Sequence, residues 1–217
     1  MNESFSLALG PLVLSESILL SFLVSALIAF TGWLATRKGP DSALHTALQA
    51  AMELVEQAVA DVLPKQNVRM VFPFVATLWL FLLCANLVGL IPGLSSPTRD
   101  LSITSALAIT VFVAVHVYGI RAAGLKNYLR HYLKPSPILL PFHLISELTR
   151  TLALAIRLFG NMMSLEMAAL LVLIVAGFLV PVPLLVLHVV EALVQAYIFG
   201  MLALIYISTA LDTQEKD

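Results

Sequence analysis

Long apolar runs separated by short polar segments occupy most of this 217-residue chain. The first run predicts a membrane-spanning helix over residues 17–36, because about 20 apolar residues match a hydrocarbon core roughly 30 Å thick. Two further runs predict spans over 71–91 and 101–120. Pro92 and Gly93 end the second predicted span, and the Ser- and Pro-containing stretch that follows them predicts a loop.

The segment between the first two predicted spans mixes apolar and polar residues at helical spacing. Leu44 and Leu48 share this segment with polar neighbours such as His45 and Gln49. A mixture of this kind is typical of a helix with one apolar and one polar face. It therefore predicts an amphipathic helix over 41–63 that lies on the membrane surface.

A longer apolar stretch of 40 residues, from Pro141 to Val180, lies in the last third of the chain. As one helix it would be about 60 Å long, which is about twice the thickness of the membrane core. We therefore expect a long helix over 136–180 that kinks or tilts strongly, with two separate spans as the alternative. A Pro-x-Pro turn follows, and the next apolar run predicts a helix over 184–211.

Composition indicates the same class of protein. The chain is 60% apolar and 12% charged, with a mean hydropathy of +0.97, whereas soluble domains are about 45–50% apolar and about 25% charged. We predict an all-α membrane protein that forms one membrane-embedded domain (1–217), with three spanning helices, a surface amphipathic helix and a C-terminal hairpin of long tilted membrane helices. Cys84 is the only cysteine, which excludes an intrachain disulfide and a metal site built on cysteine pairs. We expect no metal and no cofactor.

Basic residues gather in two of the segments between the predicted spans. Because positive loops stay on the cytoplasmic side, they predict an outer N-terminus, and the side of the C-terminus stays open. The loop 94–100, where Arg99 is offset by Asp100, is predicted to lie outside. The first apolar run lacks the basic start of a cleaved signal peptide, so we expect it to be retained. The inner basic residues are Arg37, Lys38, Lys65 and Arg69 in the first segment, and Arg121, Lys126, Arg130 and Lys134 in the second.

One cation lies in the middle of a predicted membrane helix. Arg157 is surrounded by apolar residues in the segment TLALAIRLFGNMMSLEMAALLV. A charged side chain at membrane depth costs at least a few kcal/mol and usually faces a partner or a water-filled path, and arginine cannot lose its proton as lysine can. Arg157 is therefore either a defect tolerated through pairing or part of an ion pathway. Its placement favours the pathway.

Further polar side chains recur at helical spacing in the two long C-terminal helices. Carboxylates and imidazoles can accept and release protons, so several of them in adjacent apolar helices favour ion transport. The alternative is structural: Glu166, His188 and Glu191 pair with one another and with Arg150 to hold the helices together. The candidates are Glu147, placed to pair with Arg150; Arg150, Arg157, Asn161 and Ser164 on one helix side; Glu166 roughly opposite; and His188, Glu191, Gln195 and Tyr206 along the last helix.

Three segments of the chain resemble subunit a of the rotary ATP synthases. They are VFPFVATLWLFLLCANLVGLIPG, ELTRTLALAIRLFGNMMSLE and HVVEALVQAYIFGMLALIYIS, and the resemblance extends over about residues 72–208. It implies the static half of a membrane motor, which abuts a rotating ring of c subunits that each carry one ion-binding carboxylate. Such a subunit has no ATPase activity alone, and the chain contains no G-x-x-x-x-G-K-[ST] motif.

The resemblance also implies roles for individual residues. Arg157 matches the arginine that faces the ring carboxylate, between two aqueous half-channels. Glu166 and His188 look like the outer half-channel pair, although many relatives carry Glu at the position of His188. Glu191, about one turn later, is an additional titratable group. The remaining matches are Asn161 and Gln195 near the ion paths, and Glu147 and Arg150 near the start of the long helix.

The same resemblance implies the partners of the chain. They are the c-ring subunits, b-type peripheral-stalk subunits, membrane lipid and a transported proton or, alternatively, a sodium ion; we expect no nucleic acid. A bacterial plasma membrane is the expected location. A stand-alone secondary transporter would show inverted repeats, which the two halves of this sequence do not. A purely structural anchor predicts instead that Arg157→Ala harms assembly rather than ion coupling.

Overall fold

Helices make up nearly all of the chain described by the computed structural model, which comprises residues 7–9, 12–38, 42–91, 94–125, 128, 140–176 and 182–212. Five of the described helices, α1, α3, α4, α6 and α7, are long and apolar enough to cross a membrane, which confirms the prediction of an all-α membrane protein. The elements are β1 (Leu7–Leu9), β2 (Leu12–Leu14), α1 (Glu16–Lys38), α2 (Ala43–Val62), α3 (Lys65–Val88), the 3-10 helix η1 (Pro97–Arg99), α4 (Leu101–Ala123), α6 (Leu140–Ala176) and α7 (Val182–Asp212).

A short antiparallel ribbon of β1 and β2 precedes α1 and is not predicted by the sequence pattern. Each strand has three residues, and Leu7 pairs with Leu14. Alternation of polar and apolar residues becomes recognisable over four to eight residues. Strands this short therefore leave no clear pattern in the sequence.

Local signals set several helix ends. The hydroxyl of Ser42 accepts a hydrogen bond from the backbone nitrogen of His45 at 3.2 Å and so caps the start of α2. At the start of α4, Oδ1 of Asp100 accepts one from the backbone nitrogen of Ser102 at 2.9 Å. Gly124 follows the end of α4 with a φ of 77°, a conformation that glycine adopts without steric cost.

The observed helices differ from the predicted spans mainly at their ends. α3 begins at Lys65 rather than at residue 71, because helical hydrogen bonding continues through polar residues that the hydrophobic pattern leaves out. α6 runs without a break over 37 residues, which corresponds to about 55 Å. The alternative of two separate spans therefore does not occur within 140–176. Predicted helix residues 136–139 and 177–180, and the basic residues Lys126, Arg130 and Lys134, lie outside the described residues.

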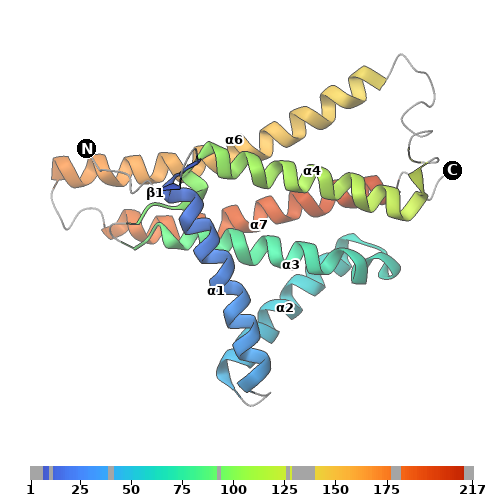
Figure 1. The fold of residues 1–217 in the computed structure, drawn as a ribbon, viewed down its shortest axis with the longest axis horizontal. Helices are drawn as coiled ribbons and strands as arrows, with labels where there is room; N and C mark the ends of the chain where they lie inside the picture. Colours follow the sequence, from blue (N-terminus) through green and yellow to red (C-terminus); the bar gives the residue numbers. More distant parts are fainter. Residues whose placement is uncertain are drawn as a thin grey trace.

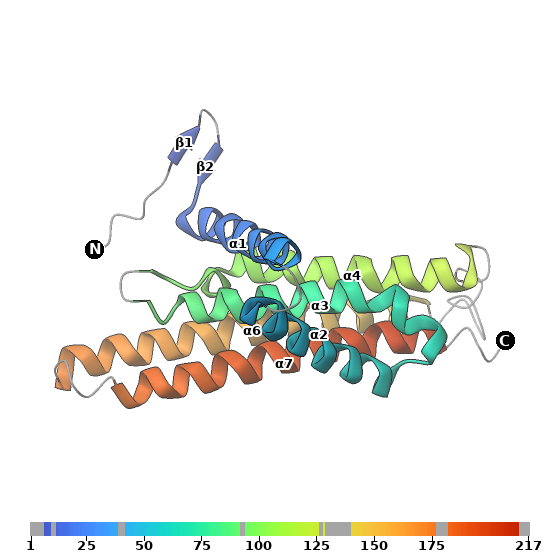
Figure 2. The same cartoon turned by 90° about the horizontal axis from the view of Figure 1, so that it is seen from below.

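Four long helices, α3, α4, α6 and α7, form the body of the molecule. In Figure 1, α1 crosses this body at a steep angle. Figure 2 shows α1 on one side of α3 and α4, and α6 and α7 on the other side. Accordingly, α1 packs against α2, α3 and η1, whereas α6 packs against α4 and α7. The two long C-terminal helices therefore lie on the side of the body that α1 does not cover.

The buried core joins apolar residues of α2, α3, α4, α6 and α7 into one cluster. Leu82, Leu158 and Phe199 are among its largest fully buried side chains. α3 approaches α7 closely where the indole ring of Trp79 covers Gly200, and a Cβ atom at Gly200 would overlap that ring. Only glycine permits this approach, which sets how α7 lies against α3.

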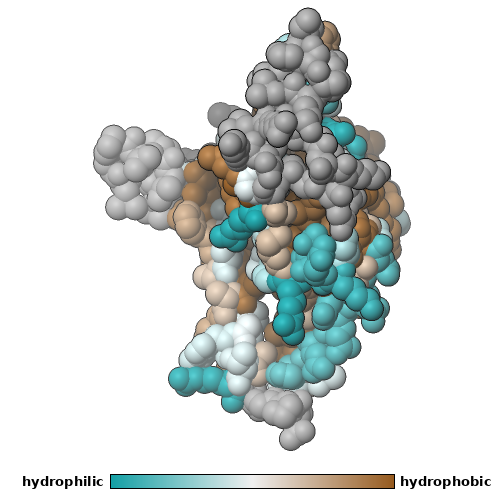
Figure 3. Space-filling model, turned by 90° about the vertical axis from the view of Figure 1, so that its right-hand side faces the viewer, coloured by the Kyte–Doolittle hydropathy of each residue, from teal (hydrophilic) through white to brown (hydrophobic). Residues whose placement is uncertain are grey.

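The end of α7 lies beside the junction of α2 and α3. The Ser208 hydroxyl donates a hydrogen bond to the carbonyl oxygen of Val62 at 3.5 Å, and Leu211 belongs to the same buried cluster as Leu63. Figure 3 views the molecule from the end where α3 begins and shows hydrophilic residues gathered over part of that end. α7 therefore ends at the same end of the molecule at which α3 begins.

Candidate functional site

Arg157 lies near the middle of α6 and points away from the helices that α6 packs against. Leu154 and Leu158 are buried in the core, whereas the side chain of Arg157 is exposed. Within the described residues, Arg157 has no hydrogen-bond or ion-pair partner. An unpaired guanidinium that faces lipid is costly. This face therefore requires a polar partner or water opposite Arg157.

Apolar side chains are exposed on both long helices around the level of Arg157. Ile156 is 60% exposed and Leu152 is 59% exposed on α6, and Leu193 and Tyr197 are about half exposed on α7. An exposed apolar surface in a membrane protein is covered by lipid or by another subunit. The unpaired guanidinium of Arg157 lies within this apolar surface. Its charge distinguishes the surface from one that contacts lipid alone.

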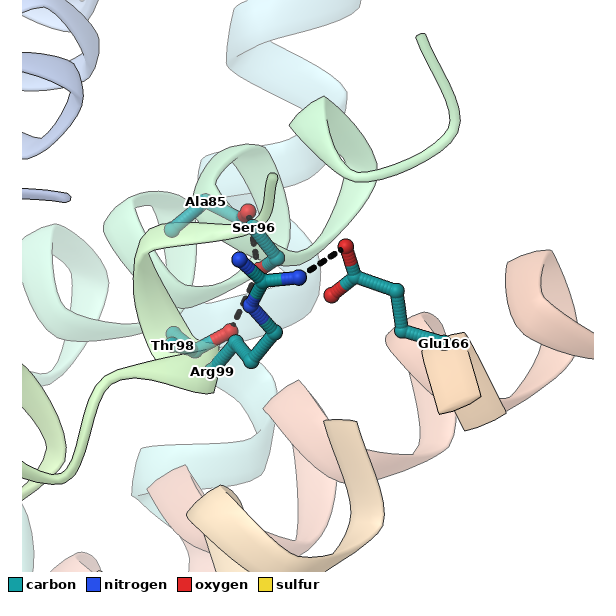
Figure 4. Close-up of polar contacts among 5 residues, drawn as sticks. All are labelled: Ala85, Ser96, Thr98, Arg99 and Glu166. Atoms are coloured by element: carbon teal, nitrogen blue, oxygen red, sulfur yellow. Dashed lines mark hydrogen bonds and ion pairs between the residues drawn. The ribbon is translucent and has the colours of Figure 1, made fainter. Parts of the chain in front are cut away.

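An ion pair joins the loop before α4 to the second half of α6. Nη1 of Arg99 donates to Oε1 of Glu166 at 2.7 Å, as Figure 4 shows. The Arg99 side chain is 41% exposed and that of Glu166 is 18% exposed. Besides Arg99, the ionisable residues His188 and Glu16 interact electrostatically with Glu166. Glu166 therefore lies within electrostatic reach of groups on η1, α7 and α1.

His188 lies inside the protein, next to the end of α3. Its side chain is 5% exposed. A Cβ atom at Gly89 would lie 3.4 Å from Nε2 of His188 and 3.0 Å from Cβ of Ser96. The absence of a side chain at Gly89 therefore leaves room for the imidazole against α3. Glu166 and His188, which the sequence paired, are thus on facing elements, although the direct partner of Glu166 is Arg99.

A buried chain of hydroxyl and amide groups connects the loop before α4 with α3 and α7. Ser96 Oγ donates to the carbonyl oxygen of Ala85 at 2.9 Å and lies 2.6 Å from Thr98 Oγ1 (Figure 4), and Thr98 donates to Oδ1 of Asn86 at 2.8 Å. Asn86 Nδ2 donates to the carbonyl oxygen of Ala192 at 3.3 Å. The hydroxyl groups of Ser96 and Thr98 take part in three hydrogen-bonding contacts but carry only two hydrogens. These hydrogens can therefore be arranged in more than one way.

An amide pair connects α6 with α7 close to Arg157. Nδ2 of Asn161 donates to Oε1 of Gln195 at 2.7 Å, and Gln195 is 2% exposed. Three buried polar atoms, Glu166 Oε2, His188 Nε2 and Gln195 Nε2, have no hydrogen-bond partner among the described residues. Buried polar atoms are normally satisfied by protein or by ordered water. These three atoms therefore leave hydrogen-bonding capacity unused by the described protein residues around the Arg99–Glu166 pair and the amide pair.

A second polar cluster lies toward the start of α6. Cζ of Arg150 lies 5.3 Å from the ring centroid of Tyr206. Oε2 of Glu147 lies 3.6 Å from Nε2 of His116 on α4, so Glu147 contacts His116 rather than the Arg150 partner that the sequence suggested. A cavity of about 20 Å³ lies between these residues and is lined by Val111, Phe112, Val115, Glu147, Arg150, Thr151, Leu154 and Tyr206. A volume of this size holds about one water molecule.

Two predicted site residues lie outside these clusters. Ser164 is exposed on α6, and Glu191 is partly buried on α7. Neither has a side-chain hydrogen bond or an ion pair within the part of the chain that the structure describes. The structural alternative, in which Glu166, His188 and Glu191 pair with one another and with Arg150, is therefore not supported for Glu191.

Several residues of the polar clusters are not found by the sequence analysis. Arg99 is the clearest case, because the sequence suggested that Asp100 offsets its charge, whereas the Asp100 carboxylate caps α4. The signal was present: Asp100 directly precedes an apolar run, which is the N-cap position. The others are Asn86, Ser96, Thr98 and His116, whose residue types are also common in ordinary helices and loops.

Comparison with known proteins places the chain near one group of membrane subunits. The ATP synthase A chain family matches residues 18–208. The chain is 56% identical over 212 residues to ATP synthase subunit a 2 of Pelobacter propionicus, with 95% of this chain and 91% of the relative covered. It is 54% identical to ATP synthase subunit a 1 of Hahella chejuensis (97% and 92% covered) and 50% identical to ATP synthase subunit a of Legionella pneumophila (97% and 93% covered).

Proposed function

Because this chain belongs to the ATP synthase A chain family, we propose that it is the static membrane subunit in which Arg157 faces the ion-binding carboxylates of a rotating c-ring. The family membership confirms the resemblance drawn from the three sequence segments. The chain is a multi-pass membrane protein of ATP synthesis and ion transport.

The observation that carries the proposal is the exposed, unpaired guanidinium of Arg157 within an apolar surface. A c-ring that covers this surface supplies the missing partner, since each subunit brings a carboxylate to Arg157 as the ring turns. Opposite charges at 4 Å attract by roughly 4 kcal/mol at an effective dielectric of 20. This attraction favours the ionised carboxylate and so releases its bound ion.

The two polar clusters fit two half-channels on either side of Arg157. On the outer side, an ion passes Glu166, His188 and Glu191 and reaches the ring carboxylate near the Asn161–Gln195 pair. The neutralised carboxylate then turns through lipid. On the inner side, the released ion leaves past Arg150, Glu147 and Tyr206. The unpartnered buried atoms of Glu166, His188 and Gln195 support the outer path, and the small cavity beside Glu147 supports the inner one. Ser164, exposed on α6, is a supporting polar residue.

The position of the C-terminal end of α7 supports a proposal for the side of the membrane on which this helix ends. Because Ser208 contacts Val62 at the α2–α3 junction, α7 ends on the same side as Lys65 and Arg69, the second half of the basic segment 37–69. Basic segments stay cytoplasmic, so we place both ends of this segment and the C-terminal end of α7 inside, and the N-terminus outside. The relatives named above come from bacteria, which favours the bacterial plasma membrane.

The remaining partners follow from the family. We propose the c-ring and b-type peripheral-stalk subunits as protein partners. Protons are the proposed coupling ion, and sodium is the alternative, because the ligands that select the ion belong largely to the ring carboxylate site.

Disulfide cross-linking tests whether the ring covers the Arg157 surface. Ile156 is replaced by cysteine in a Cys84→Ala background, and a second cysteine is placed beside the ring carboxylate in the c subunit. We expect oxidation of the assembled complex to link the two subunits. The matched control is Val113→Cys, which is 51% exposed on α4 and is expected not to cross-link. Cross-linking from Val113→Cys but not from Ile156→Cys would contradict the proposed ring surface.

A further inference from the structure

We propose that Arg99 sets the ion affinity of the outer path. It is a built-in cation that occupies the Glu166 carboxylate until a transported cation displaces it. The inference rests on the function proposed above for Glu166, and it adds a residue from the loop before α4 to that path.

The two carboxylate oxygens of Glu166 have different surroundings. Oε1 accepts the 2.7 Å hydrogen bond from Arg99, whereas Oε2 is buried without a hydrogen-bond partner among the described residues. Arg99 therefore compensates the charge of Glu166 but leaves its second oxygen, Oε2, without a hydrogen-bond partner in the described part of the chain. An incoming proton or metal cation that binds Oε2 then competes with Arg99 for the negative charge.

Arg99 has room to leave this position. Its side chain is 41% exposed and borders a cavity of about 380 Å³ lined by Ser17, Arg99, Asp100, Leu101, Phe159, Met163 and Met167. This volume holds several water molecules, at roughly 30 Å³ each. Glu16, next to Ser17, lies within electrostatic reach of Glu166. A displaced guanidinium thus has a space large enough for water to move into, near the second carboxylate of Glu16.

The backbone that carries Arg99 is held firmly, in contrast to the tip of its side chain. Ser96 and Thr98 are 2% and 0% exposed, and their hydroxyls contact Ala85 and Asn86 on α3. The guanidinium therefore swings from a fixed base. Because the backbone stays in place, the Glu166 carboxylate attracts the Arg99 guanidinium back each time the transported ion moves on toward Gln195.

Removal of the guanidinium is expected to increase the apparent affinity of the outer path for its ion. A partly exposed ion pair of this kind changes an equilibrium by up to about fivefold. In Arg99→Gln, the outer ion concentration that gives half the maximal rate should therefore fall by about three- to fivefold. Arg99→Lys keeps the charge but loses the planar fork, so we expect a fall of about twofold. A merely structural role predicts a lower maximal rate with no change in the half-saturating concentration.

Ion-driven ATP synthesis by the whole complex in proteoliposomes measures this concentration. Complexes whose catalytic head faces outward have their outer path open to the lumen. A fixed potassium–valinomycin potential drives synthesis while the luminal proton or sodium concentration is varied. The variants are wild type, Arg99→Gln, Arg99→Lys and, as a matched control, Arg121→Gln, which removes an exposed arginine at the other end of α4. The control should keep the wild-type half-saturating concentration.

An unchanged or higher half-saturating concentration in assembled Arg99→Gln would overturn the inference. If Arg99→Gln fails to assemble, Arg99→Lys decides by the same criterion. Glu166→Gln separates the two proposals, because wild-type synthesis by this variant would remove Glu166 from the path and overturn its proposed function together with the inference. Loss of synthesis in Glu166→Gln with an unshifted Arg99→Gln would overturn the role of Arg99 alone.

Discussion

Asn161 donates a 2.7 Å hydrogen bond to Oε1 of Gln195, about one helical turn beyond Arg157. The pair connects the two long C-terminal helices at the level of the unpaired cation. Since Gln195 is 2% exposed, its amide has little access to bulk water. The bond therefore fixes how α7 lies relative to the part of α6 that carries Arg157.

Loss of one partner of this amide pair should cost more than loss of both. Asn161→Leu leaves the buried amide of Gln195 unsatisfied, at an expected cost of about 1–3 kcal/mol in stability. The double variant Asn161→Leu with Gln195→Leu should recover much of the stability, because both polar groups are gone, but not ion transport. Thermal unfolding of the purified complex measures the stability. Equal stability losses that add in the double variant would contradict a direct pair.

Substitution at Gly200 should disrupt the packing of α3 against α7. A Cβ atom there would overlap the indole ring of Trp79, and overpacking of this kind costs about 1–3 kcal/mol. We expect Gly200→Ala to lower the amount of assembled complex in membranes, as measured by immunoblotting. Gly32→Ala is the control, because no atom lies within 4 Å of the added Cβ. Full assembly of Gly200→Ala would show that the two helices separate more easily than the structure implies.

The buried hydroxyl chain should depend on Thr98. Thr98→Val keeps the shape of the side chain but leaves Oδ1 of the buried Asn86 without its 2.8 Å donor. An unsatisfied buried acceptor costs about 1–3 kcal/mol. Thr110→Val is a matched control, since the hydroxyl of Thr110 bonds only to its own helix and is exposed. Similar melting temperatures for the two variants would rule out a stabilising role of this buried hydrogen-bonded network.

The contact of Arg150 with Tyr206 should require the ring and not the phenolic hydroxyl. A guanidinium 5.3 Å from an aromatic centroid is attracted by about 0.5–2 kcal/mol. Tyr206→Phe should therefore retain wild-type stability and ATP-driven ion uptake, whereas Tyr206→Leu should lower stability by about that amount. A defect in uptake specific to Tyr206→Phe would instead assign a function to the hydroxyl.

The helices could be predicted from the sequence more completely than the polar contacts between them. Runs of about 20 apolar residues indicate spans by length alone, and Arg157 stands out because every neighbour is apolar. Spacing could assign Asn161 to the helix side that carries Arg157, and Gln195 to the polar side of the last helix, but it could not pair the two residues. One long helix is the expectation for the 40-residue apolar stretch, and α6 agrees with it over 140–176, but the length of the stretch alone also fits two spans.

The Arg99–Glu166 pair shows why the outer cluster could not be predicted in full. The two residues are 67 positions apart, and helical periodicity relates only residues within one element. Local charge balance assigned Asp100 to Arg99, but the start of α4 uses Asp100 as its cap. Which loop reaches which helix depends on the packing of η1 against α6 and α3, and that is a property of the folded chain.

ATP-driven ion uptake into inverted membrane vesicles tests the central role of Arg157 most directly. Wild type and Arg157→Ala are compared as assembled complexes with equal ATPase content, in buffers with and without sodium. We predict that wild-type vesicles acidify and that Arg157→Ala vesicles do not, while the complex stays assembled. Sodium uptake without direct acidification in wild type would support the proposed role in a rotary motor but identify sodium as the transported ion. Unimpaired uptake by Arg157→Ala would contradict the account, because it would remove Arg157 from the ion path.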